Sequence, residues 1–480
     1  MTRKVVVVGY GMAGARLADE IRARDPRGDR VSLTIIGAEP HAAYNRVLLS
    51  AVVAGTMRPE LVRLHDQDWA AAHGIDLRTG NTAISLDRAA RTVALDDGST
   101  VDYDALVLAT GSRPWLPPVE GLALEDGTPS PGVVAFRTLD DCDRILGAAK
   151  VGAPVAVLGG GLLGLEAARG LAGRGHLVTV VHPVGHLMER QLDPGAGHVL
   201  ARALGELGID FRLGTGAARY VPGDGLKLDD GSSVQADLVV VSAGVRAETA
   251  LAKEAGLEVD RGIVVDDALR TSDGRIHAIG DCAQHPGTVS GLVEPAWQQA
   301  SVLADLVTGA DVSARYRGTN VVTKLKARGV ELTALGEAQT EVGDTGAEVL
   351  CLNDPARGMY AKLVVREDRV AGAILLGAPD AAASIVQYYD RGVPVPTDRL
   401  AVLLGRALPF GASPASSPAD LPASAVVCRC NSVTKGRLVE AFRNGATDVP
   451  ELAAVTRATT GCGSCRDAVC GIAGWLAETS

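Results

Sequence analysis

The chain has 480 residues, 47% of them hydrophobic, which is enough apolar material for about three domain cores. Its 47 basic and 57 acidic residues give a formal net charge of −10, which argues against nucleic acid or an anionic membrane as a partner. Aromatic residues make up only 3%, too few for a platform that stacks single-stranded bases, and no apolar run has the length of a transmembrane helix.

The N-terminal stretch MTRKVVVVGYG leads from a short apolar run directly into a glycine turn. This pattern predicts a first strand and not a secretion signal, so we expect a cytoplasmic protein with reduced thiols. Five of the eight cysteines fall between Cys428 and Cys470. Such a concentration predicts a metal or cluster site and not a disulfide framework.

The first nucleotide-binding pattern begins with an apolar strand, 5–8, and continues in a helix to about Arg24 and a second strand, 31–36. Its turn has the G-x-G-x-x-G spacing of a dinucleotide site, with Gly9, Gly11 and Gly14. Glu39, slightly displaced beyond the second strand, is the candidate carboxylate for the ribose hydroxyls. The alternative is a solvated loop carboxylate.

The segment HAAYNRVLLS, 41–50, occupies the place where disulfide reductases carry a C-x4-C redox pair. No cysteine occurs between Met1 and Leu139, so dithiol exchange there is excluded. Arg46 could bind a phosphate or cofactor oxygen through its guanidinium fork, with a surface ion pair as the alternative.

Two distant segments, LVLATG at 106–111 and IHAIGDCA at 276–283, are predicted strands that end in small-residue turns. Such turns let the backbone pass close to a cofactor, and Asp281 can accept hydrogen bonds from a polyol. The two segments belong together if one domain is interrupted by an insertion at about 115–243.

The second nucleotide-binding pattern lies inside this insertion, with a strand at 155–158, a helix at 162–174 and a strand at 177–181. Its turn carries Gly159, Gly161 and Gly164 in the same spacing as the first. In this spacing the first glycine makes the tight turn, the second lets the backbone approach a pyrophosphate, and the third lets helix and strand pack closely. The helix N-terminus also favours phosphate.

Further along the insertion we predict a loop or the start of a helix at 188–193, a helix at about 200–208 and a strand at 238–241. Glu166, near the start of the second fingerprint helix, is the candidate catalytic residue, as a group that positions the nicotinamide amide; complementing the helix dipole is the alternative. His182 stands where NAD-specific folds usually have an acid. The choice between NADH and NADPH therefore stays open, with a lean towards NADH.

Two fingerprints together with the ATG and GDCA segments make residues 3–309 resemble the two-dinucleotide-binding flavoproteins, the pyridine-nucleotide-dependent flavin reductases. The stretches YNRVLLS (44–50), LMERQLD (187–193), EPAWQQA (294–300) and TKLKARGV (323–330) resemble the flavin module of assimilatory NAD(P)H nitrite reductases and the electron-transfer subunit of assimilatory nitrate reductase. The resemblance implies FAD in the first fold and NADH or NADPH in the second. It implies FAD contacts at Gly9, Gly11, Gly14, Arg46, Thr110, Gly111 and Asp281, and places Glu294 to Trp297 near the isoalloxazine.

From Tyr316 to about Leu404 the sequence predicts an antiparallel sheet with a turn at 367–369 and a helix at about 381–391. It resembles the small C-terminal domain of these reductases, which implies a possible homodimer. Lys324 and Lys326 alternate onto one strand face and either reach the flavin or, as the sequence favours, stay solvated. The Pro-, Ser- and Ala-rich stretch 408–425 predicts an extended tether.

After the tether the cysteines have the spacing C-x-C, 31 residues, C-x2-C, with Cys428, Cys430, Cys462 and Cys465. Two helices, 435–444 and 450–456, are predicted between the pairs. Four thiolates can bind a [2Fe–2S] cluster or zinc; C-x-C is unusual for zinc, and Gly461 and Gly463 allow backbone N–H groups to reach sulfur.

This module resembles the bacterioferritin-associated-ferredoxin-like domain, with NSVTKG at 431–436 and TTGCGSC at 459–465, which implies a [2Fe–2S] cluster. Zinc and an empty interaction fold remain the alternatives. The other cysteines are predicted to be small buried residues: Cys142, Cys282, Cys351 and Cys470.

The expected fold class is α/β, with two Rossmann-like dinucleotide-binding domains, a small α+β interface domain and a small helical [2Fe–2S] domain. The predicted boundaries are an FAD-binding domain (1–114 and 244–315), an NAD(P)H-binding domain (115–243), the interface domain (316–405), a linker (406–424) and the [2Fe–2S] domain (425–480).

The expected function is NAD(P)H-dependent electron transfer through FAD and the cluster to a separate protein. Because the chain ends fifteen residues after Cys465, before any sirohaem-binding domain, we expect that it serves the catalytic subunit of an assimilatory nitrate reductase. Alternatives are a donor to a separate nitrite reductase or ferredoxin-type carrier, a flavin-dependent amine or amino-acid dehydrogenase, and a redox-sensing protein. The second fingerprint argues against the dehydrogenase, because such an enzyme needs no NAD(P)H.

Overall fold

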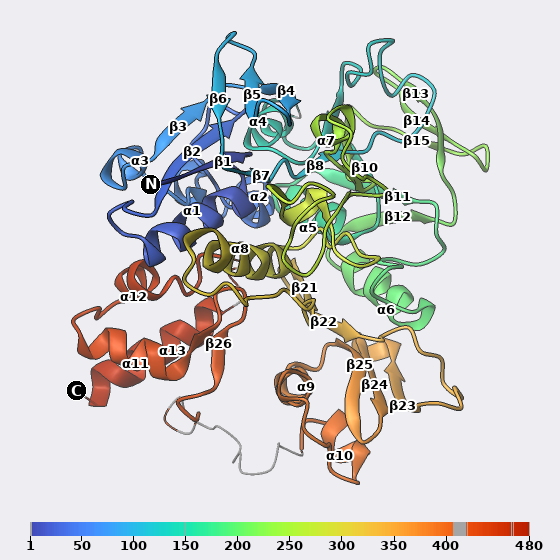
Figure 1. Ribbon diagram of the computed structural model, residues 1–480. Coiled ribbons are helices and arrows are strands. Elements are labelled where there is room, and N and C mark those ends of the chain that lie inside the picture. Colours follow the sequence, from blue (N-terminus) through green and yellow to red (C-terminus); the bar gives the residue numbers. More distant parts are fainter. Residues whose placement is uncertain are drawn as a thin grey trace.

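The computed structural model describes residues 2–148, 150–406, 419, 421–461, 463 and 465–479. The chain is built around two parallel sheets and one antiparallel sheet, each of five strands (Figure 1). A small helical module follows at the C-terminus. The predicted α/β class, with two nucleotide folds followed by two smaller units, is confirmed. None of the described helices is long and apolar enough to cross a bilayer.

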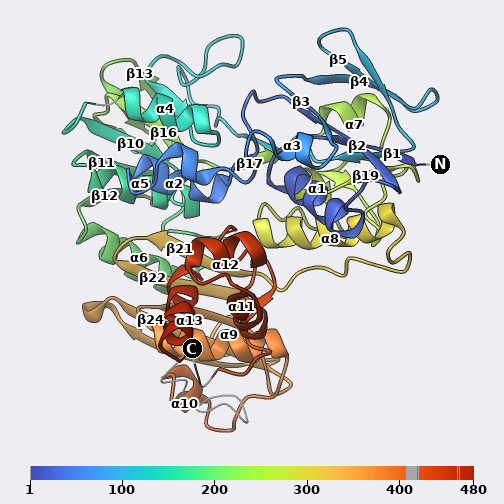
Figure 2. The ribbon, with the colours of Figure 1, turned by 90° about the vertical axis from the view of Figure 1, so that its left-hand side faces the viewer.

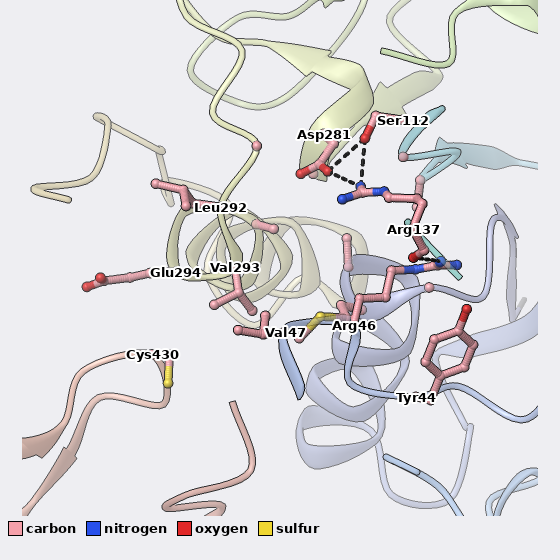
Figure 3. Close-up of a pocket in the computed structure, with 18 of the residues that line it drawn as sticks. Tyr44, Arg46, Val47, Ser112, Arg137, Asp281, Leu292, Val293, Glu294 and Cys430 are labelled. Atoms are coloured by element: carbon pink, nitrogen blue, oxygen red, sulfur yellow. Dashed lines mark hydrogen bonds and ion pairs between the residues drawn. The ribbon is translucent and has the colours of Figure 1, made fainter. Parts of the chain in front are cut away.

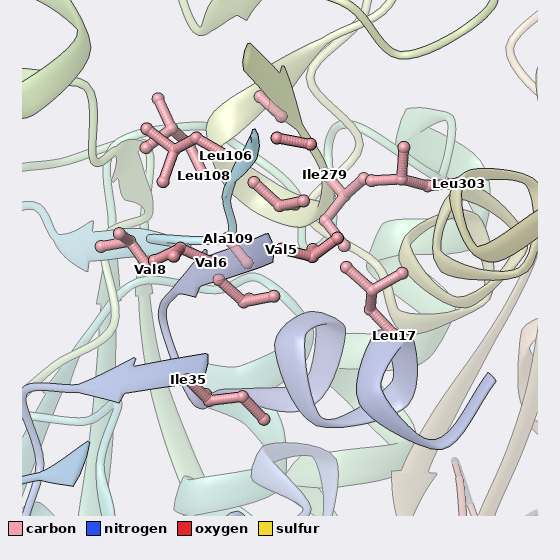
Figure 4. Close-up of a cluster of buried hydrophobic side chains, with 14 of the residues drawn as sticks. Val5, Val6, Val8, Leu17, Ile35, Leu106, Leu108, Ala109, Ile279 and Leu303 are labelled. Atoms are coloured by element: carbon pink, nitrogen blue, oxygen red, sulfur yellow. The ribbon is translucent and has the colours of Figure 1, made fainter. Parts of the chain in front are cut away.

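The first parallel sheet has the strand order β19-β7-β1-β2-β3. Its strands are β1 (Arg3–Val8), β2 (Val31–Gly37), β3 (Asp76–Thr79), β7 (Ala105–Leu108) and β19 (Ile276–Ala278). Helices α1 (Met12–Arg24) and α8 (Val293–Thr308) pack against each other, and Leu17 and Leu303 from these helices meet Val5 in the core (Figure 4). β19 pairs directly with β7, so the two distant segments of the sequence share one sheet.

The second parallel sheet has the order β12-β11-β10-β16-β9. Its elements are β9 (Val133–Ala135), β10 (Pro154–Leu158), α5 (Leu162–Gly173), β11 (Leu177–His182), α6 (Pro194–Gly205), β12 (Ile209–Leu213) and β16 (Leu238–Val241). Helix α6 begins six residues before the predicted start. The reason is a cap: Asp193 accepts a 2.9 Å hydrogen bond from the Ala196 N–H, and Pro194 occupies the first helical position.

The chain enters and leaves the second sheet through one antiparallel ribbon. The ribbon pairs β8 (Ser112–Pro114) with β17 (Val245–Ala247). The other short strands are β4 (Ala83–Asp87), β5 (Thr92–Leu95), β6 (Thr100–Asp102), β13 (Ala217–Val221), β14 (Gly225–Leu228), β15 (Ser233–Val234), β18 (Ile263–Val264) and β20 (Ala283–Gln284). The other short helices are α2 (Leu49–Val53), α3 (Trp69–Ala72), α4 (Leu139–Ala148) and α7 (Ala250–Glu254).

The third sheet is antiparallel, with the order β21-β22-β25-β24-β23. Its elements are β21 (Val322–Ala327), β22 (Val330–Gly336), β23 (Glu348–Asp354), β24 (Met359–Arg366), β25 (Arg369–Leu376), α9 (Pro379–Arg391) and α10 (Arg399–Leu403). The predicted turn between β24 and β25 is confirmed: Glu367 and Asp368 both have positive φ, as a two-residue hairpin requires. A buried ion pair of 2.8 Å between Lys362 and Asp193 joins this sheet to the second one.

The C-terminal module contains β26 (Val426–Cys428), β27 (Val433–Thr434), α11 (Lys435–Arg443), α12 (Val449–Thr456) and α13 (Arg466–Thr479). Both helices predicted between the cysteine pairs are confirmed. The module lies against α8 and near α9 (Figures 1 and 2), and its core includes Ala296 and Trp297 of α8. Most of the predicted linker, 407–418 and 420, lies outside the described residues.

Two cysteine predictions are wrong. Cys351 on β23 and Cys470 on α13 are exposed, because each points away from the core face of its element. Cys142 and Cys282 are buried as predicted.

Candidate functional site

A cavity of about 410 Å³ opens where the first sheet, the second sheet, β21 and the C-terminal module meet (Figure 3). The first glycine turn lines it with Gly9 and Gly11, and α5 contributes Glu166. The other predicted residues that line it are Glu39, Arg46, Thr110, Gly111, Asp281 and Glu294. Gly14 does not line it, although its neighbour Ala13 does. Cys430 of the C-terminal module lines the same cavity.

Both glycine turns have the geometry that their spacing predicts. Gly9 and Gly159 have φ of +116° and +120°, and a Cβ on either would lie 2.1–2.2 Å from a carbonyl oxygen of the neighbouring strand end. A Cβ on Gly14 or Gly164 would lie 1.9 or 2.1 Å from the carbonyl oxygen of the first glycine in its own turn.

The middle glycine of each turn has open space around it, unlike the first and third glycines. A Cβ on Gly161 would meet nothing within 4 Å, and a Cβ on Gly11 would meet only the Arg46 side chain, at 3.9 Å. In both turns the open position is therefore the one through which a pyrophosphate can approach the backbone.

Glu39 and Arg46 form an ion pair at the rim of the cavity. The Tyr44 hydroxyl donates to Glu39 at 2.6 Å, and Arg46 donates to the carbonyl oxygen of Arg137 at 3.2 Å. Burial raises the pKa of Tyr44, so this hydroxyl stays protonated and keeps its role as a donor. The carboxylate and guanidinium are thus fixed beside the first turn, at the wall of the cavity.

Asp281 is held by two side chains that the sequence analysis did not single out. Arg137 donates to it at 2.6 Å and Ser112 at 3.0 Å (Figure 3). The Arg137 Nε is buried without a hydrogen-bond partner among the described residues, and Arg137 lines the cavity. A polar cofactor in the cavity fits this uncompensated donor. Thr110 donates to the Glu248 carbonyl at 2.7 Å, which fixes the ATG turn.

Glu166 is buried, and its carboxylate accepts hydrogen bonds from Ser50 at 2.7 Å and from the Lys326 backbone N–H at 3.2 Å. Burial raises its pKa, against the opposing charge of Lys326. Glu166 lies beyond the first turn of α5, where a helix-dipole effect is weak. Lys324 and Lys326 both line the cavity, so the preference for solvated lysines is wrong for half-buried Lys326; Lys324 is exposed at the rim.

Glu294 and Trp297 lie on different surfaces of α8. Glu294 lines the cavity, whereas Trp297 packs into the core of the C-terminal module and donates to the Met12 carbonyl at 3.1 Å. The resemblance implies that both lie near the isoalloxazine; the structure keeps Trp297 out of the cavity lining because the module covers its ring. A Cβ on Gly461 would lie 2.8 Å from that ring.

At the end of β11, His182 accepts a hydrogen bond from the Gly160 N–H at 3.2 Å and lies 3.1 Å from Glu189. Burial lowers the pKa of His182, so its ring is neutral at pH 7 and can act as this acceptor. His182 stands at the position that usually distinguishes NADH from NADPH, and here its side chain supports the second glycine turn. The carboxylate beside it is that of Glu189.

The cysteine site brings together buried thiols from both ends of the module. Cys428 and Cys430 have their sulfur atoms 3.8 Å apart, and Cys465 is buried beside them. Hydrogen bonds from the Cys430 and Cys465 thiols, and from the backbone N–H groups of Thr459 and Asn431, hold the pKa of the Cys428 thiol well below its usual range. Converging thiols with amide donors fit an iron–sulfur cluster. Cys462 lies outside the described residues.

Residues 3–300 match the model of the pyridine nucleotide-disulphide oxidoreductases. The chain belongs to this family. Residues 322–391 match the rubredoxin NAD+ reductase C-terminal domain, and residues 426–473 match the BFD-like [2Fe-2S] binding domain. This pyridine nucleotide-disulphide oxidoreductase is therefore an NAD(P)H-dependent flavoprotein, with FAD- and NAD(P)-binding folds and a [2Fe–2S] domain, although it has no C-x4-C pair in its first fold.

The oxidoreductase is similar to two proteins of Bacillus subtilis (strain 168). It is 37% identical over 472 residues to a nitrite reductase [NAD(P)H], covering 97% of this chain and 57% of that protein. It is 35% identical over 474 residues to an assimilatory nitrate reductase electron transfer subunit, covering 97% of this chain and 59% of that protein. The chain thus spans less than two thirds of these relatives.

Among solved structures, the oxidoreductase is similar to the covalent putidaredoxin reductase–putidaredoxin complex, with a TM-score of 0.73 and 27% identity. The alignment covers 83% of this chain and 95% of that one. The likeness agrees with the fold seen in the two nucleotide-binding sheets.

Proposed function

We propose that this oxidoreductase is the electron-transfer component that carries electrons from NAD(P)H to the catalytic subunit of an assimilatory nitrate reductase. The proposal rests mainly on one observation: Cys430 of the cysteine module lines the same cavity as the first glycine turn. The similarity to a nitrate reductase electron transfer subunit supports the choice of acceptor. The similarity to a nitrite reductase supports a second candidate, a donor to nitrite reduction.

Each proposed cofactor has a set of residues that would hold it. FAD would lie against Gly9, Gly11 and Gly14, with Glu39 and Arg46 at one end, Thr110, Gly111 and Asp281 in the middle, and Glu294 at the far rim. NADH or NADPH would lie against Gly159, Gly161 and Gly164, and the cluster would bind Cys428, Cys430, Cys462 and Cys465. When bound, the flavin accepts two electrons from the nicotinamide and the cluster releases them one at a time.

The protein's own part in this function is to position and to shield. Glu166, fixed by Ser50 and by the Lys326 backbone, presents a carboxylate at the cavity that would orient the nicotinamide amide. Arg137 and Asp281 would hold the polyol of the flavin between a donor and an acceptor. We assign no side-chain acid or base, because the cofactors supply the chemistry.

A cytoplasmic location is part of the proposal. Cys142, Cys282, Cys351 and Cys470 are free thiols, which suits a reducing compartment. A homodimer through the third sheet also stays a proposal, supported by the match to the rubredoxin NAD+ reductase C-terminal domain.

The decisive experiment is an anaerobic titration of the holoprotein with NADH and, separately, with NADPH. We expect flavin bleaching followed by the EPR signal of a reduced [2Fe–2S] cluster. Absence of bleaching with both nucleotides would overturn the reductase function, and bleaching by an amine or amino acid alone would favour the dehydrogenase.

Reconstitution with the catalytic subunits of nitrate reductase and of nitrite reductase then separates the two acceptors. We expect NAD(P)H-dependent reduction of nitrate with the first subunit. Turnover with the nitrite reductase subunit alone would select the second candidate.

A further inference from the structure

The cysteine module is attached to the rest of the chain beside its second cysteine pair. The Asn45 side-chain amide donates to the carbonyl oxygens of Thr460 at 2.6 Å and of Gly461 at 2.5 Å, immediately before Cys462 in the chain. Asn45 is only 1% exposed, and the next residue, Arg46, lines the flavin cavity. One buried amide thus connects the cavity wall to the cysteine loop.

The module is also attached beside its first cysteine pair. Arg429 stands between Cys428 and Cys430 and donates to the Asn320 carbonyl at 2.8 Å. Its guanidinium also lies 3.4 Å from Glu294 of α8 and forms an ion pair with Asp390 of α9. A single side chain therefore contacts the flavin-binding fold, the strand connection before β21 and the third domain.

Further contacts extend this interface along α1. Arg457 pairs with Asp19, and Arg16 donates to the Asn431 amide oxygen at 2.7 Å. Asp19 is bonded in turn to His65. These side chains are partly or fully buried, and Asn45 and Arg429 bind specific backbone carbonyls, so the contacts together fit one orientation of the module.

We propose that Arg429 and Asn45 are positioning residues that hold the cysteine module in one docked arrangement, with Cys430 at the wall of the flavin cavity, and that this docked state is the one in which the cluster is reduced. The inference rests on the proposed function. A module that moved freely between the flavin and an acceptor would not need specific contacts beside both cysteine pairs, as Asn45 and Arg429 provide here.

The test uses Asp390, which binds Arg429 but does not line the flavin cavity. In the holoprotein, Asp390→Ala removes one arm of the contact, and Asp390→Glu keeps the carboxylate. Asp380→Ala, an exposed position in the first turn of the same helix, is the matched control. Amide hydrogen exchange of residues 429–432 reports docking, and stopped-flow mixing with NADH reports flavin bleaching and cluster reduction separately.

For Asp390→Ala we expect about tenfold faster exchange, equivalent to ~1.4 kcal/mol, and slower cluster reduction at an unchanged rate of flavin bleaching. Asp390→Glu should recover most of both effects, and Asp380→Ala should match the unaltered protein. The inference is overturned if Asp390→Ala leaves exchange unchanged, or if exchange increases while cluster reduction keeps its rate. Failure of the proposed function is distinguishable, because the unaltered protein would then show no bleaching.

Discussion

The second glycine turn offers a test in which two neighbouring substitutions should affect different properties, one the binding of NADH and the other the stability of the fold. Gly161 has φ −84° and ψ 178°, an extended conformation that any residue adopts, and a Cβ there would meet nothing within 4 Å. Gly161→Ala should therefore leave the fold intact. A methyl group would, however, occupy the space through which a pyrophosphate approaches, and we expect about tenfold weaker NADH binding, ~1.4 kcal/mol.

Gly164→Ala should act on the fold instead. Its Cβ would lie 2.1 Å from the Gly159 carbonyl oxygen, which is backbone and cannot rotate away. Overpacking of this kind costs about 1–3 kcal/mol, which corresponds to a Tm lower by roughly 2–12 °C for a domain of this size.

The assay combines thermal unfolding with stopped-flow flavin bleaching at increasing NADH concentration. FAD content is the internal control, because both substitutions lie in the second fold. In the first fold, Gly11→Ala should lower the FAD content and have no direct effect on the second turn. Equal Tm losses for Gly161→Ala and Gly164→Ala, or unchanged NADH binding in Gly161→Ala, would refute the assignment of the open position to the nucleotide.

Three further predictions concern buried ionisable side chains. Burial lowers the pKa of His277 to about 4, so between pH 6.5 and 4 this side chain is protonated in the unfolded chain and neutral in the native protein. Up to ~3 kcal/mol of the free energy of unfolding should therefore be lost as the pH falls from 6.5 to 4. His277→Gln should reduce this loss, as measured by urea unfolding. Lys362→Met should cost ~3–5 kcal/mol in the same assay, because Asp193 is left partly buried without its ion pair, and adding Asp193→Asn should recover part of it. Glu166→Gln keeps the shape of the side chain but replaces its carboxyl group by an amide. It should slow flavin bleaching about fivefold without changing the Tm, because losing the hydrogen bond to the nicotinamide amide costs ~1 kcal/mol.

The local parts of the fold could be predicted from sequence because they depend on neighbours in the chain. The apolar runs that became β1 and β10, and the glycines that follow them, identify strand, turn and helix within about twenty residues. The start of α6 was misjudged because the cap formed by Asp193 and Pro194 ends a loop that also carries polar and apolar residues without a clear period.

The site depended more on contacts between distant segments. Arg137 follows a short strand in the insertion, and nothing in its local sequence shows that it meets Asp281. The family resemblance implies that Glu294 and Trp297 lie together near the flavin, yet the C-terminal module covers Trp297 and leaves Glu294 at the cavity. Lys326 gains its place only when β21 packs against α5. Ser112, directly after the ATG turn, had the clearest local signal among the residues that were missed.

The ribbon of β8 and β17 has a consequence for how the chain folds. The first sheet needs β19 to pair with β7 across the whole insertion, and closing so long a loop is entropically costly and slow. Once the inserted fold has formed, however, its two ends lie side by side in the ribbon, and only residues 109–111 and 248–275 remain between β7 and β19, 31 residues in place of 167. The inserted fold thus shortens the loop that the β7–β19 pairing must close, and we expect the second sheet to form before the first is complete.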